Sequence, residues 1–139
     1  MEPTITVQTT IKAPIEKVWE SWTKPEHITK WNQASDDWHT PHAENDLRIG
    51  GRFLFRMEAK DGTVGFDFRG VYDEVKNHEK IVYHTEDGRN VESTFTANGS
   101  ETTITGTFVP ENENPHEMQR GGWQAILDNF KKYTESLNN

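Results

Sequence analysis

The chain has 139 residues, no cysteine and a net charge of −8, with 32% hydrophobic and 11% aromatic residues. This length predicts one domain spanning residues 1–139, and the lack of cysteine excludes disulfides, thiol nucleophiles and thiolate metal sites. The acidic balance argues against nucleic-acid and membrane-surface partners, and the absence of a signal-peptide pattern or a membrane-length apolar stretch predicts a cytoplasmic protein.

The N-terminal third predicts a strand, two short helices and a loop. Residues 5–11 alternate apolar and polar side chains, which indicates a half-buried strand. Pro14 suits the first turn of a short helix with Val18 and Trp19 on its apolar face, and a second short helix follows from Pro25. Residues 32–45 have no periodicity, so we expect a long loop, a kind of segment that is often functional.

The middle of the chain predicts a series of strands joined by tight turns. Alternating or β-prone stretches occupy residues 53–57, 64–68 with its extension 71–75, 81–85, 91–97 and 102–109. Asp61-Gly62, Asp87-Gly88 and Asn98-Gly99 are typical hairpin turns. Because sequential hairpins join neighbouring strands, we expect an antiparallel sheet.

The last third changes to helical periodicity. Residues 116–137 predict one amphipathic helix, with Asn114 as its cap and Pro115 at its first position. Its apolar stripe carries Trp123, Leu127, Phe130, Thr134 and Leu137. We expect the Gly121-Gly122 pair to mark a close approach of the helix backbone to its neighbours.

These elements predict an α+β fold in which the long C-terminal helix buries its stripe against the sheet. The sheet would be curved and antiparallel, with about six or seven strands wrapped around the helix and two short helices after the first strand. Such an arrangement tends to leave a cavity between the sheet and the helix. An exposed edge strand, 5–11 or 53–57, would let the chain form a homodimer rather than a monomer.

The order of these elements and several local motifs resemble the START-like, or Bet v 1-like, helix-grip superfamily. Within it, the chain is similar to the AHSA1-like branch, named for the activator of Hsp90 ATPase. The matching pieces are residues 13–14, 18–19, 31, 46–48, 50–53, 61–62, 68–72, 102–104 and 122–123. The resemblance implies a cavity between sheet and long helix, roofed by the short helices and nearby loops.

Alternation along the strands predicts which side chains face the long helix. The expected inward residues are Phe53, Phe55, Met57, Phe66, Phe68, Tyr83 and Phe95, meeting Trp123, Leu127 and Phe130 on the helix. These rings would form either a filled aromatic core or the wall of an apolar pocket. His84 adjoins Tyr83 on one strand, so one of the two points inward.

A second candidate cluster lies around the expected loop. Trp31, Trp38, His39 and His42 would either cover the edge of the core or form a mobile lid that offers a ligand a polar contact. The two histidines with neighbouring carboxylates are a weaker candidate for a divalent metal site. We expect neither a metal nor another cofactor.

The sequence contains no nucleophile elbow, phosphate-binding glycine loop or zinc-binding helix. The favoured function is therefore the binding of a small hydrophobic or amphipathic molecule in the cavity. One alternative is an interaction with an Hsp90-type chaperone. Another is a cyclase- or dehydratase-like enzyme that uses His84, Tyr83 or His39 inside the cavity.

Overall fold

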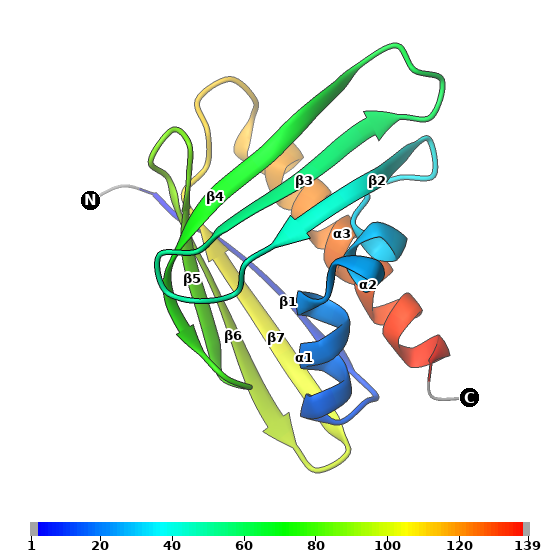
Figure 1. Ribbon diagram of the computed structural model, residues 1–139, viewed down its shortest axis with the longest axis vertical. Helices are drawn as coiled ribbons and strands as arrows, with labels where there is room; N and C mark the ends of the chain where they lie inside the picture. The colour runs from blue at the N-terminus through cyan, green and yellow to red at the C-terminus, as the bar shows by residue number, and fades with distance from the viewer. Residues whose placement is uncertain (1–2, 138–139) are drawn as a thin grey trace.

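The computed structural model describes residues 3–137, in which one curved antiparallel sheet grips a long helix (Figure 1). The strands are β1 (Ile5–Ile11), β2 (Trp38–Asn45), β3 (Arg52–Ala59), β4 (Gly65–Lys76), β5 (Lys80–Thr85), β6 (Asn90–Asn98) and β7 (Glu101–Phe108). The helices are α1 (Ile15–Thr23), α2 (Pro25–Trp31) and α3 (His116–Ser136). The predicted α+β helix-grip fold is confirmed.

The sheet has seven strands in the order β1-β7-β6-β5-β4-β3-β2, and every neighbouring pair is antiparallel. The chain therefore crosses from β1 at one edge, through α1 and α2, to β2 at the other edge. Hairpins then lead back across the sheet to β7, which pairs with β1. Since α3 lies along β1 and α2 along β2, helices cover both margins of the curved sheet.

The prediction of a loop over residues 32–45 is wrong for the second half of that segment, which forms strand β2. The register between β2 and β3 shifts between His39 and His42, with Pro41 inside the shift. This irregularity breaks the period-two pattern that would have identified the strand. Because the segment is hydrogen-bonded to β3, it is an edge strand rather than a mobile lid.

The prediction that residues 53–57 form an exposed edge is also wrong, because β2 covers β3. At the other edge, β1 is shielded by side chains of α3. The backbone N–H and carbonyl of Gln8 bond the side chain of Gln124 at 3.4 and 3.2 Å, and Lys131 donates to the Thr10 carbonyl at 2.7 Å. Glu135 accepts from the Lys12 amide at 2.9 Å. These contacts occupy backbone groups that would otherwise be free to pair with another chain.

Helix α3 starts one residue later than its capping signal predicts. Pro115 is the residue before the first turn, and the Asn114 side chain bonds Glu111 instead of capping the helix. The expected close approach at Gly121 and Gly122 is wrong as well, since a methyl group added at either position would meet open space. At both positions, therefore, no close neighbour requires a glycine.

A glycine that does mark a close approach next to the core is Gly70 in β4. The Phe53 ring lies over it from β3, so an added Cβ would come within 2.5 Å of that ring. Gly70 thus lets a fully buried aromatic ring lie flat on the neighbouring strand. Further along this strand, its register with β5 shifts between Tyr72 and Glu74.

Candidate functional site

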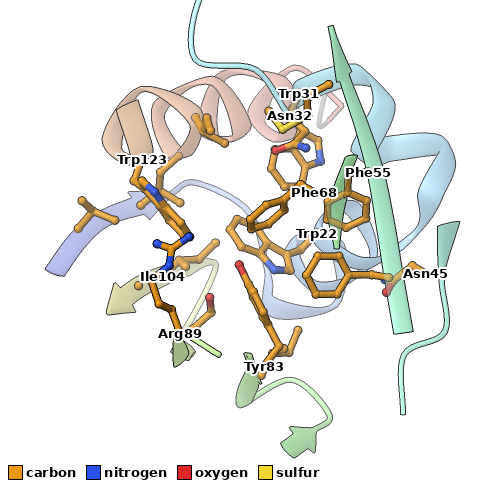
Figure 2. Close-up of a pocket in the computed structure, with 18 of the residues that line it drawn as sticks. Trp22, Trp31, Asn32, Asn45, Phe55, Phe68, Tyr83, Arg89, Ile104 and Trp123 are labelled. Atoms are coloured by element: carbon orange, nitrogen blue, oxygen red, sulfur yellow. The ribbon is translucent and has the colours of Figure 1, made fainter. Parts of the chain in front are cut away.

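A cavity of about 380 Å³ lies between the concave face of the sheet and helix α3 (Figure 2). Strands β3, β4 and β5 form one wall, α3 forms the opposite wall, and α1 and α2 close one end. The aromatic residues that line it are Trp22, Trp31, Phe53, Phe55, Phe66, Phe68, Tyr72, Tyr83 and Trp123. Aliphatic side chains, among them Ile104, Ile126 and Leu127, fill the spaces between the rings.

The sheet wall is organised around Phe53. Its ring centroid lies 4.9 Å from that of Phe55, 5.6 Å from that of Phe68 and 4.8 Å from that of Tyr83. Alternation places these rings on one face of the sheet, and the absence of a side chain at Gly70 lets them lie close together. Phe53 is buried, whereas Phe55 and Phe68 are half-buried because one side of each ring faces the cavity.

The end of the cavity next to α1 and α2 is closed by tightly packed rings. Trp22 of α1 and Trp31 of α2 stack with centroids 5.0 Å apart, and Phe130 of α3 meets both edge-on at 4.9 and 4.8 Å. The Trp31 indole N–H donates to the Ser21 carbonyl at 2.8 Å, which fixes α2 against α1. The Asn129 side chain donates to the Trp31 carbonyl at 2.8 Å and ties α3 to the same group.

Tyr72, Asn45, Tyr83 and Asn32 are among the polar residues that line the cavity. Tyr72 donates its hydroxyl to Asn45, which in turn donates to the Thr23 carbonyl at 2.6 Å. Burial raises the pKa of Tyr72, and the Asn45 contact opposes this rise. Burial also raises the pKa of Tyr83, while the nearby Arg89 charge acts in the opposite direction. The amide nitrogen of the Asn32 side chain is buried without a hydrogen-bond partner.

The remaining polar lining comes from the segment between β7 and α3 and from the β5–β6 turn. Gln119 holds this segment in place, accepting from the Glu111 amide at 2.9 Å and donating to the carbonyls of Glu111 and Asn114. Arg89 reaches the same region from the turn. Trp123 stacks on Phe108 with centroids 4.1 Å apart, so it forms a fixed part of the wall.

The structure brings nine of the predicted site residues to the cavity. They are Trp31, Phe53, Phe55, Met57, Phe66, Phe68, Tyr83, Trp123 and Leu127. Phe95 and Phe130 do face inward but belong to the packed core, where the ring of Phe95 contacts those of Trp19 and Trp22 of α1.

The other predicted residues lie outside the cavity. Trp38 covers Phe66 near the tip of the β3–β4 hairpin, with centroids 6.0 Å apart. His84 pairs with Asp73 at 2.9 Å and His39 approaches Glu58 at 3.9 Å, both half-exposed. His42 pairs with Glu44 at 2.6 Å. The enzymatic alternative is therefore left with Tyr83 as its one candidate group inside the cavity.

Within residues 3–137 no three histidines or carboxylates come together as a metal site would require. None of the helices in this part of the chain is long and apolar enough to span a membrane.

Sequence reasoning missed three features of the site: Arg89, Asn45 and the Trp22 face of the cavity. Trp22 was recognisable as part of an apolar helix face, but its partner rings come from distant segments. Asn45 fell within the expected loop, and Arg89 follows a turn glycine where charged residues are common. Neither carries a local signal that would separate a cavity residue from a solvated one.

Comparisons with known proteins agree with this architecture. The sequence profile of the activator of Hsp90 ATPase homolog 1-like proteins matches residues 12–135. An AHSA1-like protein from Aeromonas hydrophila is 40% identical, with a TM-score of 0.92 over 98% of this chain and 94% of the other. A protein from Cytophaga hutchinsonii is 53% identical, with a TM-score of 0.83 over 97% of this chain and 94% of the other.

A more distant neighbour is the Aha1 dimer from Colwellia psychrerythraea. It is 16% identical with a TM-score of 0.76, and the match covers 96% of each chain. At this identity the likeness shows the fold alone. No curated protein matches the chain.

Proposed function

The chain belongs to the activator of Hsp90 ATPase homolog 1-like family, and we propose that it binds a small hydrophobic or amphipathic molecule in the cavity between the sheet and α3. The observation that carries this proposal is the wall of half-buried rings, among them Phe55 and Phe68, whose free sides face the cavity. The cavity volume of about 380 Å³ falls within the range of ligand pockets, which are mostly apolar with a few polar groups.

The energetics of packing support the same conclusion. Protein interiors are normally filled, and a ring that lacks neighbours on one side loses dispersion contacts. At the end of the inner face near α1 and α2, the chain fills this space with Trp22, Trp31 and Phe130. Between the β3–β4 hairpin and α3 the chain leaves the space unfilled. An apolar guest would supply the dispersion contacts that the rings there lack.

The test uses a neutral aromatic probe, N-phenyl-1-naphthylamine, whose emission rises in an apolar environment. Ser93 lines the cavity from β6, and Thr94 is its neighbour on the other face of the same strand. We expect wild-type protein and the control Thr94→Phe to bind the probe, and Ser93→Phe to bind at least tenfold more weakly because its ring fills the cavity.

Thermal melts establish that each variant is folded, and Ile126→Phe on the α3 wall replaces Ser93→Phe if that variant does not fold. The proposal is wrong if wild-type protein does not change the probe's emission. It is equally wrong if a folded cavity-filling variant and Thr94→Phe bind the probe with the same affinity, because binding would then occur outside the cavity.

A further inference from the structure

Two hydrogen-bond donors of the cavity have capacity left for a guest. Within residues 3–137 no group is hydrogen-bonded to the Tyr83 hydroxyl, and Figure 2 shows that hydroxyl pointing toward the centre of the cavity. Arg89 uses its Nε for Asp87 at 2.7 Å and its Nη1 for the Val109 carbonyl at 3.3 Å. The second terminal nitrogen of the guanidinium has no hydrogen-bond partner in that part of the chain. A guest that displaces water from these donors without offering an acceptor leaves them unpaired at a cost in free energy, so these two groups favour a guest that brings an acceptor.

The tyrosine and the arginine act on the same region of the cavity. Arg89 lines the cavity, and its charge lowers the pKa of Tyr83 against the effect of burial, which places the guanidinium within electrostatic reach of the phenol. Figure 2 shows both side chains extending into the cavity from the β5–β6 side, opposite Trp31 and Asn32. Tyr72 differs, because its hydroxyl already donates to Asn45.

The charges around Arg89 decide which kind of acceptor fits. A second pocket shares Arg89 and Glu111 with the cavity and is lined by Asp87, Arg89, Glu111, Asn112 and Glu113. Three carboxylates against one guanidinium leave two negative charges in excess, on a chain whose net charge is −8. A carboxylate on the guest would meet a guanidinium already paired with Asp87 and repulsion from two further acids. A neutral oxygen accepts the same hydrogen bonds without that repulsion.

The walls favour a guest that is itself aromatic. Tyr83 meets Phe53 and Phe68 nearly edge-on, at interplanar angles of 80° and 83°. The rings therefore present both faces and edges to the cavity, the geometry in which aromatic rings pack best against one another. Phe55 and Trp123 extend these surfaces on the sheet and helix sides.

We propose that the preferred guest is a neutral aromatic molecule that carries a carbonyl-type acceptor oxygen at the end facing Tyr83 and Arg89. This inference rests on the proposed function and makes it more specific. It predicts a ranking among ligands of equal size and shape, in which a neutral acceptor is preferred to an anion and to a hydrocarbon.

The experiment compares three naphthalenes by calorimetry: 2-acetylnaphthalene, 2-naphthoate and 2-ethylnaphthalene. We expect the ketone to bind about tenfold more tightly than the hydrocarbon, which is the usual net effect of one hydrogen bond. We also expect it to bind at least tenfold more tightly than the carboxylate. Equal affinity for ketone and hydrocarbon, or tightest binding of 2-naphthoate, would overturn the inference while leaving the proposed function intact. If none of the three binds, the proposed function itself is wrong and the inference falls with it.

Two tyrosine variants identify the groups responsible. Tyr83→Phe removes only the unpartnered hydroxyl, so the ratio of ketone to hydrocarbon affinity should fall about tenfold toward one. Tyr72→Phe is the matched control, because it removes a hydroxyl on the same wall that is already hydrogen-bonded within the protein. If Tyr83→Phe keeps the full preference for the ketone, or if Tyr72→Phe loses it equally, Tyr83 does not bind the acceptor and the inference is wrong.

Discussion

Phe130, at the end of the inner face covered by α1 and α2, is fully buried, and the rings of Trp22 and Trp31 pack against it. Around Phe68, on the β3–β4 hairpin, rings pack on one side and the cavity lies on the other. Both regions use the same residue types, but the first set of rings comes from the three helices, whereas alternation along β3 and β4 directs the second set toward α3. The difference arises from what lies opposite: Trp22 and Trp31 pack against Phe130 in the first region, whereas Trp123, Ile126 and Leu127 of α3 line the far side of the cavity in the second.

The most severe test of this comparison replaces one ring from each region by alanine. Phe130→Ala should lower the free energy of unfolding by about 3–5 kcal/mol, because it opens a void among rings that cannot close around it. Phe68→Ala should cost about half as much or less, since its ring is only partly surrounded by protein atoms. Urea unfolding of both variants measures the difference. Equal losses would mean that the cavity region is packed as tightly as the core.

The dependence of the free energy of unfolding on pH above about 9 tests whether Tyr83 is buried in the cavity. Burial raises the pKa of Tyr83 above its ordinary value of 10.0, so the folded protein keeps a proton that the unfolded chain loses. The stabilising effect is complete below pH 10 and declines as pH rises above it, by roughly 1.4 kcal/mol per pH unit for each such group.

Tyr83→Phe should therefore show a shallower loss of stability between pH 9 and 11 than wild-type protein, as measured by urea unfolding at each pH. Tyr133→Phe is the comparison variant: burial raises the pKa of Tyr133 as well, but its hydroxyl bonds His27 outside the cavity, and we expect a smaller effect than for Tyr83→Phe. If Tyr83→Phe and wild-type protein lose stability in parallel, the phenol is solvated and the cavity is an open water-filled cleft.

These outcomes depend on features that the sequence predicts to different degrees. Strict alternation in β3 and β4 is enough to assign Phe53, Phe55, Met57, Phe66 and Phe68 to the inner face, since a strand has only two faces. Strand β2 escaped prediction because Pro41 and the register shift interrupt its pattern. Whether Tyr83 or His84 points inward depends on which alternate residues of β5 face the concave side of the sheet. Only the register with β4 settles this.

The polar groups of the cavity could not be predicted for a different reason. Arg89 acquires its position from the turn after β5 and from the Val109 carbonyl, which lies 20 residues further along the chain. Such a residue is defined by contacts that form only when the sheet is closed. Alternation identifies the apolar wall, whereas polar anchors at strand ends require the three-dimensional arrangement.

The smallest expected effect concerns the half of α3 that borders the cavity. A glycine inside a helix costs about 0.5–1 kcal/mol relative to alanine, and a methyl group at Gly121 would meet no neighbouring atom. Gly121→Ala should therefore raise the free energy of unfolding by that amount. Gly70→Ala is the contrasting variant and should lower it, because its methyl group collides with the Phe53 ring. A loss of stability in Gly121→Ala would show that this part of α3 is more closely packed than described.

NMR of the complex with 2-acetylnaphthalene shows whether an apolar guest lies between the sheet and α3. We expect intermolecular NOEs from the naphthyl protons to the side chains of Phe55, Phe68 and Ile126, on the two facing walls. NOEs confined to the exposed side chains of Val64 and Met118, or the absence of any in the bound state, would contradict this expectation.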